Sequence, residues 1–336
     1  MSANRFVVLK SRPAGKVSAD DFEILSGPVP EPEAGQVLIR NLYLSIDPGV
    51  RNLLGAQEGY LPPIPIGAPM SGSVLGVVLD SRHSDFRRDD LLIGRGTLGD
   101  HSVIVPGPLC WKVDPDRAPS LSSALGVLGN TGRTAYFGLL EVGRPQPGET
   151  VLVSGAAGGV GSLVGQIARI KGCRAVGIAG GEEKRRRLIE EFGFDAAVDY
   201  RGKGRAELSA AIAGACPDGV DVFFDNVGGP ILDAALPCMN SGGRAALCGM
   251  ISQYDGSAPP EMENLFFIIA RSLRLEGFLL TQFAGRYDEA VAALSAWIAD
   301  GRLRYREEVA EGLEQVVPTF LRLFDGTNQG KTMVKL

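Results

Sequence analysis

The stretch 151–170 constrains the fold more than any other part of the chain, because an apolar run, a cluster of glycines and an amphipathic segment follow one another there. Val151–Val153 is typical of a buried parallel strand, and apolar residues recur at helical spacing over Val160–Ile170. Glycines between a strand and a helix let backbone N–H groups approach a pyrophosphate. The pattern predicts a dinucleotide-binding turn, with an ordinary glycine turn as the alternative. Its predicted contacts are Gly158, Gly159, Val160 and Gly161.

The segment after this turn favours NADP(H) over NAD(H). Arg174–Ala179 predicts the next strand, and an NAD site carries Asp or Glu about 20 residues after the glycines to bind the ribose 2′-hydroxyl. Gly180 and Gly181 occupy that place here, and the cationic run Lys184–Arg187 follows. A missing carboxylate beside cations suits a 2′-phosphate, although at least part of such a run is a solvated helix face.

Composition excludes several classes of function. The net charge of −5 gives no basic footprint for nucleic acid. No apolar run reaches the roughly 18 residues of a membrane span, and Met1–Arg5 resembles neither a signal nor a transit peptide, so a cytoplasmic protein without membrane contacts is expected. The 5 cysteines are scattered and lack any C-x-x-C pair, which indicates reduced thiols.

Two domains are predicted within the 336 residues. Residues 1–125 contain short strand-like runs divided by Pro and Gly, residues 126–302 alternate strands with helices, and residues 303–336 have no strand–helix partner left and are expected to return to the first domain. The expected fold is therefore α/β, a β domain plus a doubly wound parallel sheet of Rossmann type. The candidate strands of the first domain are Arg5–Leu9, Phe22–Leu25, Gln36–Arg40, Ser73–Leu79 and Ser102–Val105.

Several short motifs are spread along the chain: Leu44–Pro48 with Arg51, Thr134–Gly138, Ala156–Gly161, Asp225–Gly229, Cys248–Tyr254 and Gly330–Thr332. They resemble those of the zinc-independent medium-chain dehydrogenase/reductases, in the branch of prostaglandin, leukotriene and curcumin reductases. The resemblance covers essentially the whole chain. It implies a GroES-like catalytic domain built from both chain ends, a Rossmann domain between them, and a homodimer formed through edge strands near Leu273–Phe278.

No zinc site is expected. The only histidines are His83 and His101, and Ser45–Asp47 and Gly67–Met70 stand where zinc-dependent relatives carry their ligand motifs. Without a Lewis acid a plain ketone would lack polarisation of its carbonyl, whereas conjugate reduction needs only a donor for the enolate oxygen. We therefore expect NADPH-dependent reduction of the C=C bond of α,β-unsaturated ketones and aldehydes, by hydride transfer to Cβ.

Tyr254 is the first candidate for that donor, because it follows a predicted strand ending at Cys248, at the carboxyl edge of the sheet where ligands bind. Tyr60 is the second, from the loop that faces the cleft in similar enzymes. A packing role is the alternative for each tyrosine. The resemblance further implies cofactor contacts from Lys184 and Tyr200 at the 2′-phosphate, from Asn226 at the ribose, and at the nicotinamide half from Cys248, Gly249, Met250, Ile251, Ser252, Tyr254, Phe278, Leu279, Leu280 and Asn328.

Two other functions stay open at this point. The same zinc-free scaffold supports quinone reduction, although the Tyr254 loop and the Gly330–Thr332 ending favour enone reduction. A protein that binds NADPH without useful turnover is the third possibility.

Overall fold

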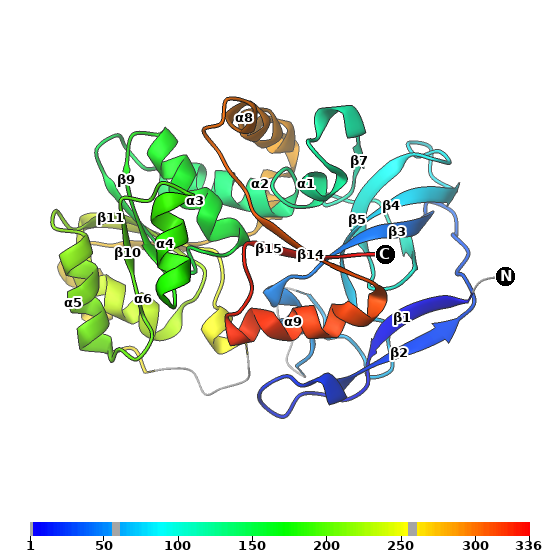
Figure 1. Cartoon of the computed structure of the whole chain (residues 1–336), viewed down its shortest axis with the longest axis horizontal. Coiled ribbons are helices and arrows are strands. Elements are labelled where there is room, and N and C mark those ends of the chain that lie inside the picture. Colours follow the sequence, from blue (N-terminus) through cyan, green and yellow to red (C-terminus); the bar gives the residue numbers. More distant parts are fainter. Residues whose placement is uncertain (1–2, 56–60, 255–260) are drawn as a thin grey trace. The chain divides into compact units, whose positions relative to one another are not determined.

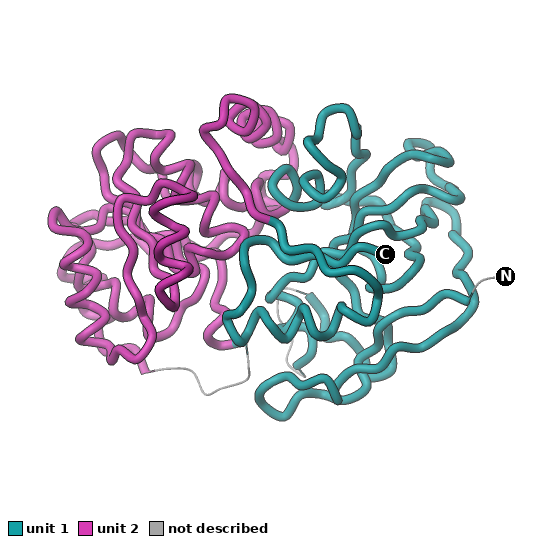
Figure 2. The backbone as a smooth tube through the Cα atoms, viewed as in Figure 1, with its two compact units in different colours: residues 1–129, 254–256, 307–336 teal, residues 130–253, 257–306 magenta. Residues whose placement is uncertain are grey.

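The computed structural model describes residues 3–55, 61–254 and 261–336. The chain forms two compact units (Figure 2), one of residues 1–129, 254–256 and 307–336 (unit 1) and one of residues 130–253 and 257–306 (unit 2). Tyr60 lies outside the described residues. No helix in the described ranges has the length and apolar character that crossing a membrane requires.

Unit 1 is built on a mostly antiparallel sheet of 7 strands, with β1 and β2 forming a separate hairpin (Figure 1). The last strand of the chain pairs antiparallel with β3, so both ends of the sequence contribute to one sheet. The strands are β1 (Asn4–Leu9), β2 (Phe22–Gly27), β3 (Val37–Ser45), β4 (Ser71–Ser81), β5 (Leu91–Thr97), β6 (His101–Ile104), β7 (Trp111–Val113), β14 (Glu307–Glu311) and β15 (Lys331–Lys335), and the helices are α1 (Leu121–Leu125) and α9 (Val316–Asp325).

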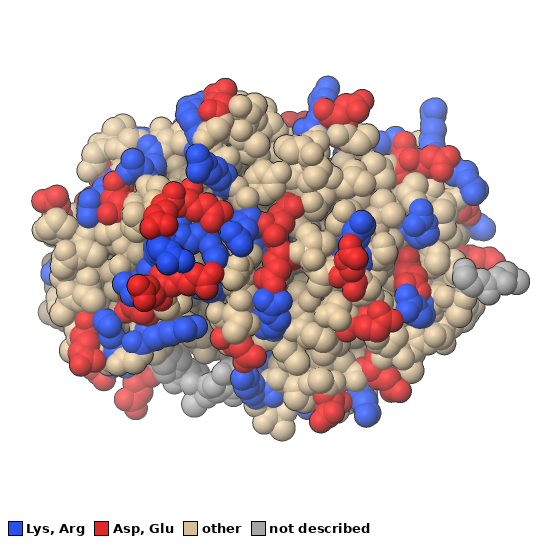
Figure 3. Space-filling view, in the orientation of Figure 1, with Lys and Arg blue, Asp and Glu red and all other residues tan. Residues whose placement is uncertain are grey.

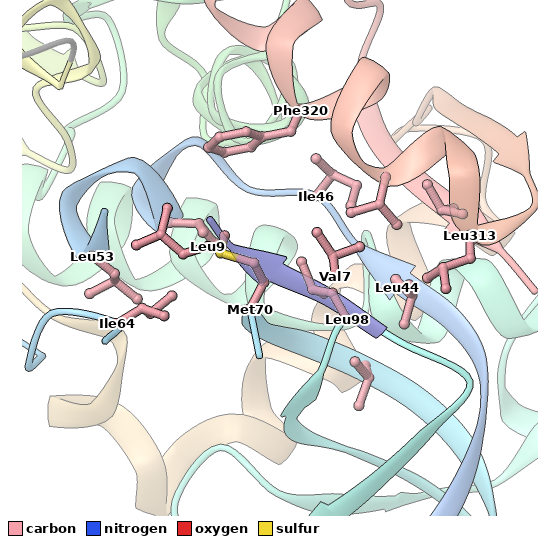
Figure 4. Packing of buried hydrophobic residues seen from close by; sticks show 14 of the residues in the cluster. Val7, Leu9, Leu44, Ile46, Leu53, Ile64, Met70, Leu98, Leu313 and Phe320 are labelled. Atoms are coloured by element: carbon pink, nitrogen blue, oxygen red, sulfur yellow. The ribbon is translucent and has the colours of Figure 1, made fainter. Parts of the chain in front are cut away.

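The core of unit 1 lies between α9 and these strands. Val7 and Leu9 of β1 pack with Leu44 of β3 and with Met70, and Phe320 of α9 covers them (Figure 4). Phe320 also meets Phe22 edge to face, with 6.1 Å between ring centroids. The alternation of apolar residues along each strand therefore places one face of the sheet against an apolar helix face.

The five strands predicted for this unit are present, but β5, β7, β14 and β15 are missing from the prediction. Gly94 and Gly96 interrupt the apolar pattern of β5, and their role emerges only in the sheet. A Cβ at Gly94 would lie 2.8 Å from Ile104, and one at Gly96 would lie 2.6 Å from the Ser102 hydroxyl. Close approach of β6 explains why residues with side chains are excluded there.

Unit 2 contains a parallel sheet of 6 strands in the order β10-β9-β8-β11-β12-β13, with helices between consecutive strands (Figure 1). The chain runs outward from β8 in one direction and then from β11 in the other, which is the doubly wound topology predicted from the sequence. The strands are β8 (Thr150–Val153), β9 (Arg174–Ile178), β10 (Ala196–Val198), β11 (Val220–Asp225), β12 (Met239–Leu247) and β13 (Arg274–Gly277). The helices are α2 (Asn130–Phe137), α3 (Gly159–Ile170), α4 (Glu182–Glu190), α5 (Arg205–Ala215), α6 (Gly229–Ala235), α7 (Phe266–Ala270) and α8 (Tyr287–Ala299).

The order of the strands places the carboxyl ends of β8 and β11 side by side, where the winding reverses. Val222–Phe224 pairs directly with Val151–Val153. Ligands of doubly wound sheets bind at this switch point. The glycine turn after β8 and the Asp225–Gly229 motif after β11 are thus neighbours, although 70 residues separate Gly155 from Asp225 in the sequence.

Candidate active site

The glycine turn has the geometry of a phosphate cradle. Gly155 has a φ of +56°, and Gly158 is the residue before the first turn of α3, where no side chain forms a capping hydrogen bond. A Cβ at Gly161 would lie 2.4 Å from the Gly155 carbonyl oxygen and 2.8 Å from Ala156 Cα. The first turn of α3 therefore packs directly on the backbone of the turn. The N–H groups of an α-helix's first turn lack partners within the helix, so this end of α3 is suited to an anion.

A buried hydrogen-bond network fixes the two strand ends at the switch point. Ser154, which follows β8, donates its hydroxyl to Asp225 Oδ1 at 2.6 Å and accepts from the backbone N–H of Asn226 at 2.8 Å. The Asn226 amide nitrogen in turn donates to the Ser154 carbonyl at 2.7 Å. Asp225 Oδ1 also accepts the N–H groups of Val227 and Gly228, at 3.0 Å and 3.1 Å. The network holds Asn226 next to the glycine turn, where a Cβ at Gly155 would lie 3.4 Å from Asn226 Cβ.

Burial raises the pKa of Asp225 above its ordinary value, even though the Ser154 hydroxyl and two backbone N–H groups favour its charged form. The Ser154 hydroxyl and the two N–H groups that donate to this carboxylate all belong to unit 2. Asp225 is 1% exposed, so its role is to organise the turn.

The segment after β12 continues from the same network. The backbone N–H groups of Cys248 and Gly249 donate to the Asp225 carbonyl at 2.8 Å and 3.2 Å, and the Ser252 hydroxyl donates to the Val227 carbonyl at 2.7 Å. A short 3-10 helix, Ile251–Gln253, then leads to Tyr254. The predicted contacts in 248–252 are thus tied to the β11 end, while the half-buried Tyr254 is grouped with unit 1.

Cys248 lacks the character of a reactive thiol. Burial raises the pKa of its thiol to about 12, and the nearby Asp225 carboxylate acts in the same direction. The thiolate is the nucleophilic form of cysteine, and it is scarce at neutral pH when the pKa lies so high. The side chain therefore serves as a small packing group beside the turn.

The place after β9 where an NAD site has its carboxylate is occupied by side chains from the end of β10. A Cβ at Gly180 would lie 3.0 Å from the ring of Tyr200 and 2.6 Å from Arg201 Nε. Tyr200, predicted at the 2′-phosphate, is thus beside Gly180. Lys184 lies half-buried in the first turn of α4, next to Gly181 in sequence.

Three members of the cationic run on α4 have acidic partners. Arg185 pairs with Asp199 at 3.6 Å, Arg186 with Glu190 at 3.9 Å, and Arg187 with Glu183 at 2.8 Å. Figure 3 shows Lys and Arg side chains interleaved with Asp and Glu on the visible face of the protein. The cautious interpretation of this run as a salt-bridged helix surface therefore holds for these arginines.

Phe278 fills a packing position in unit 2. Its ring meets Phe224 at 6.2 Å between centroids, and a Cβ at Gly138 would lie 2.2 Å from Phe278 Cζ. The last residue of the Thr134–Gly138 motif is therefore a glycine because the ring of Phe278 occupies the space that a side chain at position 138 would need. Leu279 is 50% exposed and Leu280 is half-buried in the segment that follows.

In unit 1 the two motifs from opposite chain ends meet. Lys331 donates its ammonium to Asp47 Oδ1 at 2.6 Å and to the Ile46 carbonyl at 3.2 Å, and the Ser45 hydroxyl donates to Asp47 Oδ2 at 2.5 Å. Burial alone would raise the pKa of Asp47, but the Lys331 charge and these hydrogen bonds hold it below its ordinary value. The half-buried Asn328 comes just before β15, in the same unit.

Three residues of this arrangement escaped the sequence prediction. Ser154 could have been found as the polar residue that ends a buried strand, and Asp199 and Arg201 as the polar residues that end β10 on either side of Tyr200. Their partners are distant in sequence, which is why no local pattern revealed them. The described ranges contain no group of three His, Cys, Asp or Glu side chains placed to hold a metal ion.

A parallel sheet of this order with a glycine cradle at its switch point is typical of a dinucleotide-binding domain. Comparison with known proteins makes the assignment narrower. Residues 5–113 match the family model described as the N-terminal domain of oxidoreductase, and residues 159–296 match the one described as zinc-binding dehydrogenase.

Relatives align with the chain over almost its full length. The NADPH-dependent curcumin reductase of Escherichia coli is 39% identical over 99% of this chain and 97% of its own. The NADP⁺-dependent 2-alkenal reductase of Nicotiana tabacum is 40% identical over 99% and 97%. The crystal structure of CurA in complex with NADPH from Vibrio vulnificus superimposes with a TM-score of 0.91, at 36% identity over 98% of both chains. The chain belongs to the medium-chain dehydrogenase/reductases, in the branch of NADP-dependent double-bond reductases. The predicted family and fold class are thereby confirmed.

Proposed function

We propose that this protein is an NADPH-dependent reductase of the C=C bond of α,β-unsaturated ketones and aldehydes. One observation carries the proposal: the Gly161 cradle stands at the switch point of a sheet whose neighbouring strand ends bear the Asp225 and Cys248 motifs. Proteins named NADPH-dependent curcumin reductase and NADP⁺-dependent 2-alkenal reductase are similar to this chain over almost its full length, which supports the same reaction here.

The residues of the cradle fit the cofactor. We place the pyrophosphate at the N–H groups of Gly158, Gly159, Val160 and Gly161, since the absence of a side chain at Gly161 lets this helix end pack directly on the glycine turn. Asn226, held by Ser154, lies next to this turn and would contact the ribose. Bound NADPH supplies a hydride for the substrate Cβ. Unit 2 would then be the cofactor domain and unit 1 the GroES-like catalytic domain.

Tyr254 is the proposed donor to the carbonyl oxygen. When hydride adds to Cβ, negative charge collects on that oxygen as an enolate, and a hydroxyl hydrogen bond stabilises it; water then protonates Cα. Tyr60 keeps the second place among the candidates. Ser252, two residues before Tyr254, donates its hydroxyl to the Val227 carbonyl, which ties this part of the chain to the end of β11.

The test is steady-state kinetics of Tyr254→Phe with an enone, with Tyr43→Phe as the matched control. Loss of one oxyanion donor costs about 10²–10³ in kcat, whereas NADPH affinity should stay the same. The half-buried Tyr43 lies in β3, outside the site, and its variant should keep the activity of the wild type. An unchanged kcat for Tyr254→Phe would reject the assignment.

Quinone reduction and binding without turnover are the competing functions. Absorbance of NADPH followed in parallel with an enone and a quinone separates them. If NADPH is oxidised with the quinone alone, Tyr254 is a cofactor contact and not the enolate donor. If NADPH is oxidised with neither acceptor, the protein binds NADPH without catalysis.

We also propose that the reaction needs no zinc, although one matched family model bears a zinc-binding name. Ser45–Asp47, bonded to Lys331, takes the place of a ligand motif. Activity should survive dialysis against a chelator, and loss of activity that zinc restores would refute this.

A cytoplasmic homodimer is the proposed state of the protein. β13 is the outermost strand of its sheet, and α7 beside it exposes Phe266 by 70% and Ile269 by 77%. An unpaired strand edge flanked by apolar side chains favours pairing with a second copy. Light scattering should give twice the mass of the 35.5 kDa chain. Phe266→Glu should shift this mass toward the monomer, and a monomeric wild type would refute the interface.

A further inference from the structure

The end of β10 supplies a cationic group that the α4 run does not. Arg201 is exposed, and its Nε lies where a side chain at Gly180 would begin, 2.6 Å from the position of a Cβ. Within the described residues its guanidinium forms no hydrogen bond or ion pair, in contrast to Arg185, Arg186 and Arg187. The group is therefore available to a ligand that approaches Gly180.

Asp199 holds this arrangement in place. Its Oδ1 accepts the backbone N–H of Arg201 at 3.0 Å and that of Gly181 at 3.3 Å, so one carboxylate joins the ends of β9 and β10. Arg185 balances its charge at 3.6 Å. Burial alone would raise the pKa of Asp199, but these N–H groups and nearby cations hold it below its ordinary value. Asp199 is therefore ionised, and the positive charge of Arg185 offsets the repulsion between this carboxylate and an anion beside Gly180.

Gly180 follows the end of β9, at the position that distinguishes NAD-binding from NADP-binding sites. An NAD-dependent site has a carboxylate at the end of the second strand, bonded to the ribose 2′-hydroxyl. In this protein Arg201 and Tyr200 fill that space, so a guanidinium stands where the carboxylate would be. Guanidinium groups bind phosphates through two parallel hydrogen bonds.

We propose that Arg201 is a specificity-determining residue that binds the 2′-phosphate of NADPH and so selects NADPH over NADH. The inference rests on the proposed function for the identity of the cofactor. Asp199 is the positioning residue that sets the backbone of Arg201 through their hydrogen bond.

The experiment is calorimetric titration of the protein with NADPH and with NADH, without substrate. Arg201→Gln should weaken NADPH binding about tenfold to a hundredfold, the range expected for a hydrogen bond to a charged group, and leave NADH binding within about twofold. Arg186→Gln is the matched control, because it removes the same charge from the salt-bridged surface of α4; it should change neither affinity. Adenosine 2′,5′-bisphosphate should compete with NADPH on the wild type and less well on Arg201→Gln.

A second variant tests whether the preference for NADPH can be reversed. Gly180→Asp places a carboxylate beside Arg201, whose flexible side chain can move to pair with it, so NADH should become the better ligand. Equal weakening of both nucleotides by Arg201→Gln, or no weakening, would overturn the assignment. A wild type that binds neither nucleotide would instead refute the proposed function itself.

Discussion

Gly161→Ala tests the close contact on which the cofactor site depends. The new methyl group would lie 2.4 Å from the Gly155 carbonyl oxygen and 2.8 Å from Ala156 Cα, far inside van der Waals contact. Both obstacles are backbone atoms, so no side-chain rotation relieves them. Either the first turn of α3 must move away from the glycine turn, or the turn itself must open.

The magnitude follows from two opposing effects. Overpacking in a tight interior costs about 1–3 kcal/mol, while alanine in place of glycine inside a helix returns about 1 kcal/mol. We therefore expect a net loss of up to about 2 kcal/mol of unfolding free energy, or about 4–8 °C in Tm for a domain of this size. NADPH binding should suffer more than stability, because the displaced N–H groups are those that meet the pyrophosphate.

The assay combines thermal unfolding with NADPH titration. Gly214→Ala is the control, since Gly214 lies in α5 with nothing within 4 Å of its Cβ position. That change should raise the free energy of unfolding by up to about 1 kcal/mol through helix propensity alone and leave binding intact. If Gly161→Ala were as stable as Gly214→Ala and bound NADPH equally well, the cradle would not depend on close packing.

Other consequences concern the two hydrogen-bond networks. Asp225→Asn should lower the free energy of unfolding by about 1–3 kcal/mol in chemical denaturation, because an amide nitrogen placed at either oxygen leaves buried donors without an acceptor. Equal stability would contradict the organising role of Asp225. Lys331→Met should cost about 1–2 kcal/mol, below the value for a fully buried pair because the Asp47 side chain is 43% exposed, and adding Asp47→Asn should recover part of the loss. Since the pKa of Asp47 is lowered in the folded state, the ion pair stabilises the protein above about pH 4 and is lost as the pH falls through the lowered value, so unfolding curves of wild type and Lys331→Met should converge in acid.

The local pattern of the chain was sufficient for the architecture. Buried strands alternate with helices over the middle of the sequence, and the glycines at 155–161 permit the tight turn and close packing that a phosphate cradle needs. The doubly wound sheet and its cradle therefore followed from residues close together in sequence. Five strands of the first domain were recognisable by their apolar pattern, whereas β5 was missed because glycines replace the apolar residues that face β6.

The partners of the site residues were decided by the tertiary structure. Ser154 binds Asp225, Asp47 binds Lys331, and Arg201 covers Gly180, each across a long separation in sequence. A sequence pattern reports which face of an element is buried, but it carries no information on which two polar groups meet when strands are placed side by side. The sequence by itself determined that a dinucleotide cradle exists and that cations lie nearby. Only the packing of β10 against β9 decided that three arginines on α4 pair with carboxylates while Arg201 lies beside Gly180.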